Sequence, residues 1–252
     1  MKLKKMVLGS ALLLTAALSS VSLQAAEKVR FVTEGAWAPF NFIDSSGQAQ
    51  GFDVDIARAL CAKMSADCEI GTQDWDGLIP GLKAGKFDAI IASMSITEER
   101  LKVVDFTNKY YSGGLRFMGR VGEKFDLANL EGKTIGAQRA TLGAQFLEDN
   151  FTGKADLKFY DNQDNVYLDL ESGRLDIVLS DELPTYNWLK TSKDGAKFEF
   201  KGEAFMKTDN IAIAVRKGNK KLKEQLNKAL DAILADGTYQ KINAKYFPFS
   251  IY

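Results

Sequence analysis

The sequence predicts an α/β protein with two similar lobes, because one helix–strand unit occurs twice. The two copies are residues 76–93 and 164–181, and Gly85 and Asp88 of the first correspond to Gly173 and Asp176 of the second. Each copy contains an aspartate expected to cap a short amphipathic helix, a glycine expected to end it, and an apolar strand that ends in polar residues. The alternative is a chance resemblance between two ordinary helix–strand units.

The apolar runs of the repeat indicate parallel strands that are covered on both faces. Residues 89–91 and 177–179 are continuously apolar and each follows a predicted helix. In open α/β sheets, ligands bind beyond the carboxyl ends of the strands. The sequence therefore predicts a cleft between the lobes, flanked by polar residues from both copies: Ser93, Ser95, Ser180 and Asp181.

The amino terminus has the pattern of a signal peptide. Three lysines within residues 1–5 precede an apolar run over residues 6–18 and a stretch of small residues. The run is too short to span a bilayer, although a membrane anchor is the alternative interpretation. We expect cleavage after Ala25 and export of the remaining chain. Loss of the three lysines leaves a slightly acidic protein without the basic face that nucleic-acid binding needs.

The composition excludes most catalytic chemistry. The chain contains no histidine, which rules out serine–histidine–aspartate and cysteine–histidine catalysis and every histidine-ligated metal site. No phosphate-binding or dinucleotide-binding glycine motif is present, and no cofactor or metal is expected. The two cysteines, Cys61 and Cys68, are predicted to form a disulfide in an oxidising compartment. Two buried thiols or a redox pair are the alternatives, and the spacing is not that of a CxxC motif.

The remaining elements follow in order along the chain. We expect a strand over residues 28–33, a helix over 53–64, a strand from Glu69, a linker at 110–114, a strand over 132–137, a helix from Thr141, a strand over 211–215 and a last helix over 220–235. The helix start at Thr141 faces the end of the preceding strand, and such a start is a favourable position for an anion.

Several polar and aromatic residues near strand ends are candidates for ligand binding. Arg100 follows a buried strand by a few residues and could clamp a carboxylate, or it could pair with a carboxylate such as Asp105. Asp181 could bind a ligand or cap the next helix. Trp37 and Trp75 could be ligand contacts or ordinary core residues.

The chain resembles the periplasmic solute-binding proteins of ABC importers for polar amino acids. Within that family it is most similar to the lysine/arginine/ornithine- and histidine-binding group. The resemblance covers essentially the whole mature chain. It is carried by residues 51–55 (Gly-Phe-Asp-Val-Asp), 76–80 (Asp-Gly-Leu-Ile-Pro), 95–100 (Ser-Ile-Thr-Glu-Glu-Arg), 173–176 (Gly-Arg-Leu-Asp) and 236–239 (Asp-Gly-Thr-Tyr). The positions of Cys61 and Cys68 match the disulfide of that group.

The resemblance implies a two-lobe periplasmic binding protein fold of type II. Lobe 1 would comprise residues 26–112 and 208–252, and lobe 2 residues 113–207, with the ligand in the cleft between them. It implies a function as well: delivery of a basic amino acid, of the arginine, ornithine or lysine class, to a membrane permease. The protein would be a periplasmic monomer and would contact its permease transiently.

The resemblance also implies roles for individual residues. Arg100 would bind the ligand α-carboxylate, helped by Ser95 and the backbone near Thr141, while Asp181 and the Ser93 region would bind the α-ammonium. Trp37 and Trp75 would enclose the ligand side chain, and Glu34 would contact its far end. A carboxylate there calls for a cation, because an isolated buried charge is very costly. The expected ligand-binding set is Glu34, Trp37, Trp75, Ser93, Met94, Ser95, Arg100, Gln138, Thr141 and Asp181.

The sequence departs from this group at a few positions, and these keep other functions open. Ala92 stands where a serine is common, Gly143 stands where a larger polar residue often stands, and Thr141-Leu142 replaces a pair of hydroxyl residues. The smaller side chains at positions 92 and 143 could leave room for a bulkier ligand, as in opine-binding relatives. Two further alternatives are a cyclohexadienyl dehydratase, an enzyme with a similar fold that needs no histidine, and a sensory ligand-binding domain.

Overall fold

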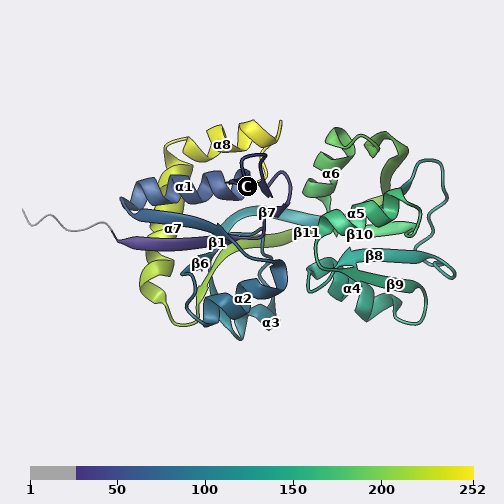
Figure 1. Cartoon of the computed structure of the whole chain (residues 1–252), viewed down its shortest axis with the longest axis horizontal. Coiled ribbons are helices and arrows are strands. Elements are labelled where there is room, and N and C mark those ends of the chain that lie inside the picture. Colours follow the sequence, from purple (N-terminus) through teal and green to yellow (C-terminus); the bar gives the residue numbers. More distant parts are fainter. Residues whose placement is uncertain (1–26) are drawn as a thin grey trace, which may run out of the picture.

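A computed structural model describes residues 27–252 and contains two lobes that lie side by side (Figure 1). The predicted signal peptide, residues 1–25, lies outside the described residues. One eight-stranded mixed sheet runs through both lobes in the order β5-β1-β6-β11-β7-β10-β8-β9. Within residues 27–252, no helix is long and apolar enough to cross a membrane.

Lobe 1 contains both ends of the described chain. Its elements are β1 (Lys28–Thr33), β2 (Ala36–Trp37), β3 (Asn41–Ile43), β4 (Ala49–Gln50), α1 (Phe52–Met64), β5 (Asp67–Thr72), α2 (Trp75–Lys83), β6 (Ala89–Ile90), α3 (Glu98–Leu101), α7 (Lys220–Ala235) and α8 (Thr238–Tyr246). Strand β1 pairs in parallel with β5 and β6. Apolar side chains of α1, α7 and α8 pack on one face of this sheet and those of α2 on the other, so the strands are covered on both faces as expected.

Lobe 2 repeats this arrangement on a smaller scale. Its elements are β8 (Thr134–Gln138), α4 (Leu142–Phe151), β9 (Asp156–Tyr160), α5 (Gln163–Glu171), β10 (Ile177–Asp181), α6 (Glu182–Thr191) and the short 3-10 helix η1 (Gly195–Lys197). Strand β8 pairs in parallel with β9 and β10. Helix α4 covers one face, and α5 covers the other.

Two long strands connect the lobes, where the sequence predicted a flexible linker. Strands β7 (Val104–Arg120) and β11 (Phe198–Arg216) are antiparallel neighbours with register shifts along their length. The predicted linker at 110–114 lies inside β7, and the predicted strand at 211–215 is the end of β11. The strands approach closely at Gly114, where an added Cβ would lie 2.9 Å from the Phe205 carbonyl oxygen. Glycine there therefore marks close strand pairing and not a linker.

The repeat seen in the sequence is confirmed as a pair of equivalent helix–strand units. Gly85 and Gly173 follow α2 and α5 with φ of 75° and 77°, the left-handed conformation that glycine adopts at low cost. The predicted helix caps were wrong by two positions. Asp74 and Asn162 occupy the N-cap positions, so Asp76 and Asp164 lie in the first turn, where a carboxylate still suits the helix dipole.

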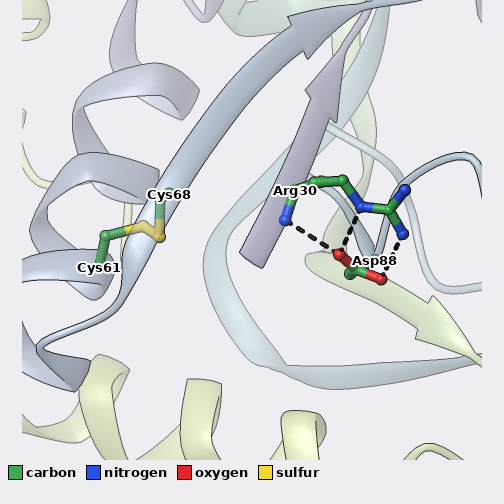
Figure 2. The surroundings of a disulfide bond; sticks show 4 residues. All are labelled: Arg30, Cys61, Cys68 and Asp88. Carbon is green, nitrogen blue, oxygen red and sulfur yellow. Dashed lines mark hydrogen bonds and ion pairs between the residues drawn. A yellow bond between two sulfur atoms is a disulfide. The ribbon is translucent and has the colours of Figure 1, made fainter. Parts of the chain in front are cut away.

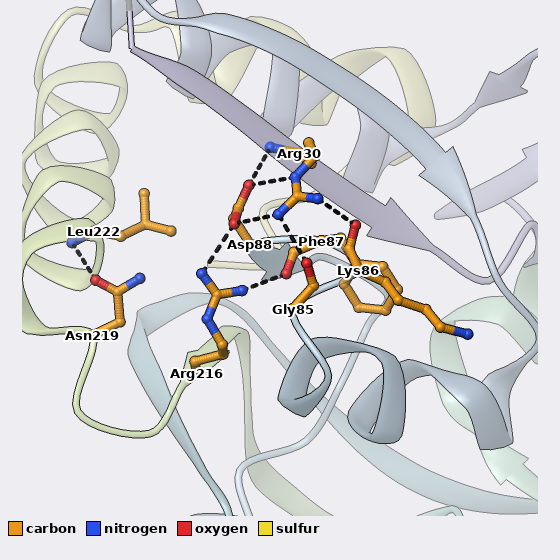
Figure 3. Close-up of polar contacts among 8 residues, drawn as sticks. All are labelled: Arg30, Gly85, Lys86, Phe87, Asp88, Arg216, Asn219 and Leu222. Carbon is orange, nitrogen blue, oxygen red and sulfur yellow. Dashed lines mark hydrogen bonds and ion pairs between the residues drawn. The ribbon is translucent and has the colours of Figure 1, made fainter.

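The aspartates of the two copies have the same structural role. Asp88 Oδ2 accepts a hydrogen bond from the Arg30 backbone N–H at 3.0 Å, and Asp176 Oδ2 accepts one from the Thr134 backbone N–H at 2.8 Å. Each aspartate thus ties its strand to the first strand of its own lobe. Asp88 also pairs with the guanidinium groups of Arg30 and Arg216, which links β1, β6 and β11 (Figure 3).

The predicted disulfide is present and lies in lobe 1, where it joins α1 to β5 (Figure 2). Cys61 is on the helix, and Cys68 is inside the strand, which begins at Asp67, two residues earlier than the sequence suggested. A further helix, α8, follows the helix that the sequence predicted to be the last. The C-terminal segment after α8 lies against the connecting strands, because Ser112 N–H donates to the Ile251 carbonyl oxygen at 2.8 Å.

Candidate functional site

A cavity that encloses about 290 Å³, including space open to solvent, lies between the lobes, and nine of the ten candidate residues line it. The nine are Glu34, Trp37, Trp75, Ser93, Ser95, Arg100, Gln138, Thr141 and Asp181, joined by Ala92 and Leu142. The carboxyl ends of β1, β6, β8 and β10 supply most of them, as expected for an α/β sheet. Met94 is not in the lining, because its side chain is buried in the core of lobe 1.

Arg100 is held at one end of the cavity by two backbone carbonyl groups. Its Nη1 donates to Ser95 O at 2.8 Å, and its Nη2 donates across the cleft to Ala140 O at 3.0 Å. The guanidinium carbon also lies 5.3 Å from the centre of the Trp75 ring. Among the described residues, Arg100 forms no ion pair. The guanidinium therefore keeps donors for a carboxylate in the cavity.

Two carboxyl groups lie close to Arg100, and one of them was missed by the sequence analysis. Asp181 is at the N-cap position of α6, yet its side chain makes no capping hydrogen bond and lines the cavity instead. Burial, reinforced by the charge of Asp209, raises the pKa of Asp181 to about 8, although Arg100 acts in the opposite direction. Asp209, from β11, accepts a hydrogen bond from Ser95 Oγ at 2.6 Å. Arg100 thus faces two acidic groups that come from different strands.

Ser93 belongs to a fully buried polar network beneath the cavity. Its hydroxyl donates to Asp53 Oδ2 at 3.0 Å, and the Asp53 carboxylate also accepts from Tyr110 and Asn41. Burial raises the pKa of Asp53 to about 6, although these hydrogen bonds act in the opposite direction. The φ of Ser93 is 52°, so the chain turns sharply at the end of β6. The network fixes this turn at the floor of the site.

The lining also contains a buried carboxyl group that has no cationic partner among residues 27–252. Glu34 is 9% exposed, and Gln138 Nε2 donates to its Oε1 at 2.6 Å from the other lobe. Burial raises the pKa of Glu34 to about 7, and nearby Asp164, Asp74 and Asp76 raise it further while Gln138 lowers it. Gln138 Oε1 is buried and makes no hydrogen bond. The Glu34 carboxyl group and the Gln138 amide oxygen are therefore two hydrogen-bond acceptors on neighbouring side chains in a strongly acidic environment.

Aromatic rings and cross-lobe contacts close the cavity. Trp37 is buried and Trp75 is half-buried, and both line the cavity. Trp75 Nε1 donates to Ala140 O at 3.3 Å, and Arg139 from lobe 2 pairs with Asp76 from lobe 1. Thr141 accepts from Ala144 N–H as the N-cap of α4, so this helix begins at the cavity. The lobes are therefore in contact across the cleft.

Comparison with known proteins identifies the family. Residues 29–249 match the bacterial extracellular solute-binding proteins, family 3. This chain belongs to that family. A putative ABC transporter arginine-binding protein 2 from Escherichia coli K12 is 40% identical over 90% of this chain and 94% of its own length. The lysine/arginine/ornithine-binding periplasmic protein of the same organism is 36% identical over 99% of each.

Solved structures give the same result for the fold. An ancestral arginine-binding protein has been solved with arginine and with glutamine, at TM-scores of 0.83 and 0.82 and identities of 36% and 37%. The two structures cover 87% and 88% of this chain, and this chain covers 98% of each of them. The two-lobe fold predicted from the sequence is confirmed, and the relatives are solute-binding proteins and not enzymes.

Proposed function

We propose that this chain is a periplasmic solute-binding protein that captures a basic amino acid, preferably arginine, and delivers it to an ABC importer. The observation that carries the proposal is that Glu34, buried in the wall of the cavity, has no cationic partner within residues 27–252. Arg100 suits an α-carboxylate, Asp181 near it suits an α-ammonium, and Glu34 suits a cation on the ligand side chain. A neutral side chain would leave Glu34 buried and unpaired, which is costly.

The acceptors around Glu34 favour a guanidinium over an ammonium as the ligand's side-chain cation. Glu34 and the unpaired Oε1 of Gln138 lie on neighbouring side chains, and a planar guanidinium can donate to several acceptors at once. The ammonium group of lysine or ornithine is more compact and satisfies these two acceptors less well. The tryptophans would add cation–π attraction of about 1–2 kcal/mol in a desolvated site. The names of the relatives, which include arginine-binding proteins, support the same ligand.

The lobe boundaries belong to the same proposal. Lobe 1 comprises residues 26–112 and 208–252 and lobe 2 residues 113–207, so the crossings fall on β7 and β11. The ligand would contact both lobes and stabilise the form in which they touch. A transient partner, the importer's permease, would then recognise that form. We propose that the protein acts as a monomer.

A variant of Glu34 tests the ligand assignment. We expect Glu34→Gln to weaken arginine by roughly 2–4 kcal/mol, as for loss of a charge-assisted contact, and to weaken glutamine far less. Calorimetric titration of both proteins with both ligands measures the difference, and the exposed Glu224 on α7 provides a matched control as Glu224→Gln. Tight glutamine binding by the parent, or equal losses for both ligands, would contradict a cationic ligand.

An opine is the second candidate, because Ala92 lines the cavity where a larger side chain would restrict it. Octopine belongs in the same titration series as arginine, ornithine, lysine, histidine and glutamine. Tighter binding of octopine than of arginine would favour this candidate. Tighter binding of arginine would favour the main proposal.

A further inference from the structure

A second cavity lies between the lobes and is larger than the first. It encloses about 600 Å³, including space open to solvent, between the β2 segment of lobe 1 and helices α5 and α6 of lobe 2. Trp37 is the one residue that lines both cavities. The side chains used below are Trp37, Gln163, Asp164, Tyr167, Asn187 and Trp188.

The walls of this second cavity contain buried polar atoms without partners. Gln163 is 2% exposed, and neither its amide oxygen nor its amide nitrogen makes a hydrogen bond. Trp37 is 6% exposed, and its Nε1 also has no hydrogen-bond partner. These atoms are buried within the wall, so the groups that an occupant of the cavity can reach are the Asp164 carboxylate and the aromatic rings.

The charge and the rings of the cavity indicate a cationic occupant. Asp164 lies exposed at the rim, and partial burial raises its pKa with no cation acting against it. No ion pair within residues 27–252 involves Asp164. Trp188 stacks on Tyr167 with ring centres 4.6 Å apart, and together with Trp37 these rings supply aromatic surface. A carboxylate beside aromatic rings is a combination that attracts organic cations.

We propose that this second cavity, between α5, α6 and β2, binds a small aliphatic ammonium compound as a site separate from the amino-acid cleft. The ammonium group would bind the Asp164 carboxylate, and its hydrocarbon part would lie against the rings. Because the site has walls from both lobes, its occupant favours the form in which the lobes touch. Occupancy of one cavity therefore strengthens binding at the other.

The three tryptophans of the chain give a direct test, because each has a different position relative to the two cavities. Trp188 lines the second cavity, Trp75 lines the first, and Trp37 lines both. The probe is 1,4-diaminobutane, which has no carboxylate for Arg100, and the matched neutral control is 1,4-butanediol. The indole N–H signals, assigned with tryptophan→phenylalanine variants, are followed by NMR without amino acid and then with saturating arginine.

In the arginine-saturated protein, where the lobes already touch, we expect the diamine to shift the signals of Trp37 and Trp188 and to leave that of Trp75 unchanged, while the diol shifts none. Saturating diamine should tighten arginine binding by roughly fivefold or more. Absence of a Trp188 shift in both titrations, or a Trp75 shift in the arginine-saturated protein, would overturn the proposal. Because the first titration contains no amino acid, a diamine-induced Trp188 shift would stand even if arginine proved not to be the ligand.

A substitution inside the cavity provides the matched control. Asn187 is half-buried on α6 and lines only the second cavity, so Asn187→Lys would place a tethered ammonium there. We expect this variant to lose the diamine-induced shift of Trp188 and to keep arginine binding without any response to diamine. Asn187→Gln, which adds no charge, should behave like the parent. Equal diamine binding by the lysine variant would contradict the proposed site.

Discussion

At the scale of single residues, burial sets the charges around Arg100. Burial lowers the pKa of Arg100 to about 10, with Asp209 and Asp181 acting in the opposite direction, so the guanidinium stays charged at neutral pH. Its hydrogen bond to Ser95 O lies within lobe 1 and positions the guanidinium even when the lobes separate, whereas the bond to Ala140 O requires that the lobes touch. A preorganised donor fork of this kind binds a carboxylate without first paying the entropy of ordering the side chain.

Arg100→Ala should therefore remove binding of every amino acid, since all of them share the α-carboxylate. Truncating one partner of a desolvated charge pair costs about 2–5 kcal/mol. Calorimetry with arginine measures the loss, and Arg58→Ala, at an exposed arginine on α1, is the matched control. A folded Arg100→Ala variant that bound arginine within a few-fold of the parent would disprove the clamp.

The sequence located most candidate residues because they follow strands or begin helices, and such positions converge at one edge of a sheet. Met94 is the exception, because it lies between Ser93 and Ser95 but its side chain is buried in the core of lobe 1. Asp209 was missed for another reason. It reaches Ser95 from a strand more than 100 positions away, and no local pattern marks that contact.

At the scale of secondary structure elements, the repeated aspartates make unequal contributions to stability. Asp88 joins two guanidinium groups, whereas Asp176 has one lysine, Lys133, at 3.6 Å. The Arg30 hydrogen bonds hold the pKa of Asp88 at about 2, although burial opposes them. A carboxyl group whose pKa is lowered by folding stabilises the protein above its unfolded pKa, and this stability is lost as the pH falls through the folded value.

We expect Asp88→Asn to lower the free energy of unfolding by about 1–2 kcal/mol at pH 7, after allowance for partial solvent screening. The loss should shrink between about pH 4 and pH 2, where the parent carboxylate itself becomes protonated. Urea unfolding measures both values. Asp176→Asn is the matched control and should cost less. A loss that did not change with pH would show that packing, and not charge, explains the effect.

Elements whose signal is local were predicted well, and those that depend on the other lobe were not. Strand β1 and helix α7 have the predicted bounds, because apolar periodicity and turn residues define them. Residues 110–114 suggested a linker through their glycines, yet pairing with β11 makes them part of a continuous strand. Only the tertiary partner decides between these two structures.

At the scale of the whole molecule, unpaired carboxyl groups oppose contact between empty lobes. Burial raises the pKa of Glu34 to about 7 and of Asp181 to about 8, and it raises the pKa of Asp209 as well. When the lobes separate, water reaches these groups and their pKa values return toward ordinary ones. The charged groups therefore favour separation at neutral pH, and a bound cation would remove part of this cost.

This difference predicts opposite effects of acid on the empty and the loaded protein. Between about pH 4.5 and pH 8 the touching form binds more protons than the separated form, so acidification should bring the empty lobes together. For each such carboxyl group, the ratio of touching to separated protein should rise by up to about tenfold per pH unit. Arginine must displace a proton from Glu34 below about pH 7, so its affinity should fall as the pH falls.

Small-angle scattering of the empty protein from pH 8 to pH 5 should show a decreasing radius of gyration, and calorimetry should show weaker arginine binding over the same range. Glu34→Gln, which carries no titrating group at this position, should reduce both responses. A radius that stayed constant or increased on acidification would mean that these carboxyl groups do not control the contact between the lobes.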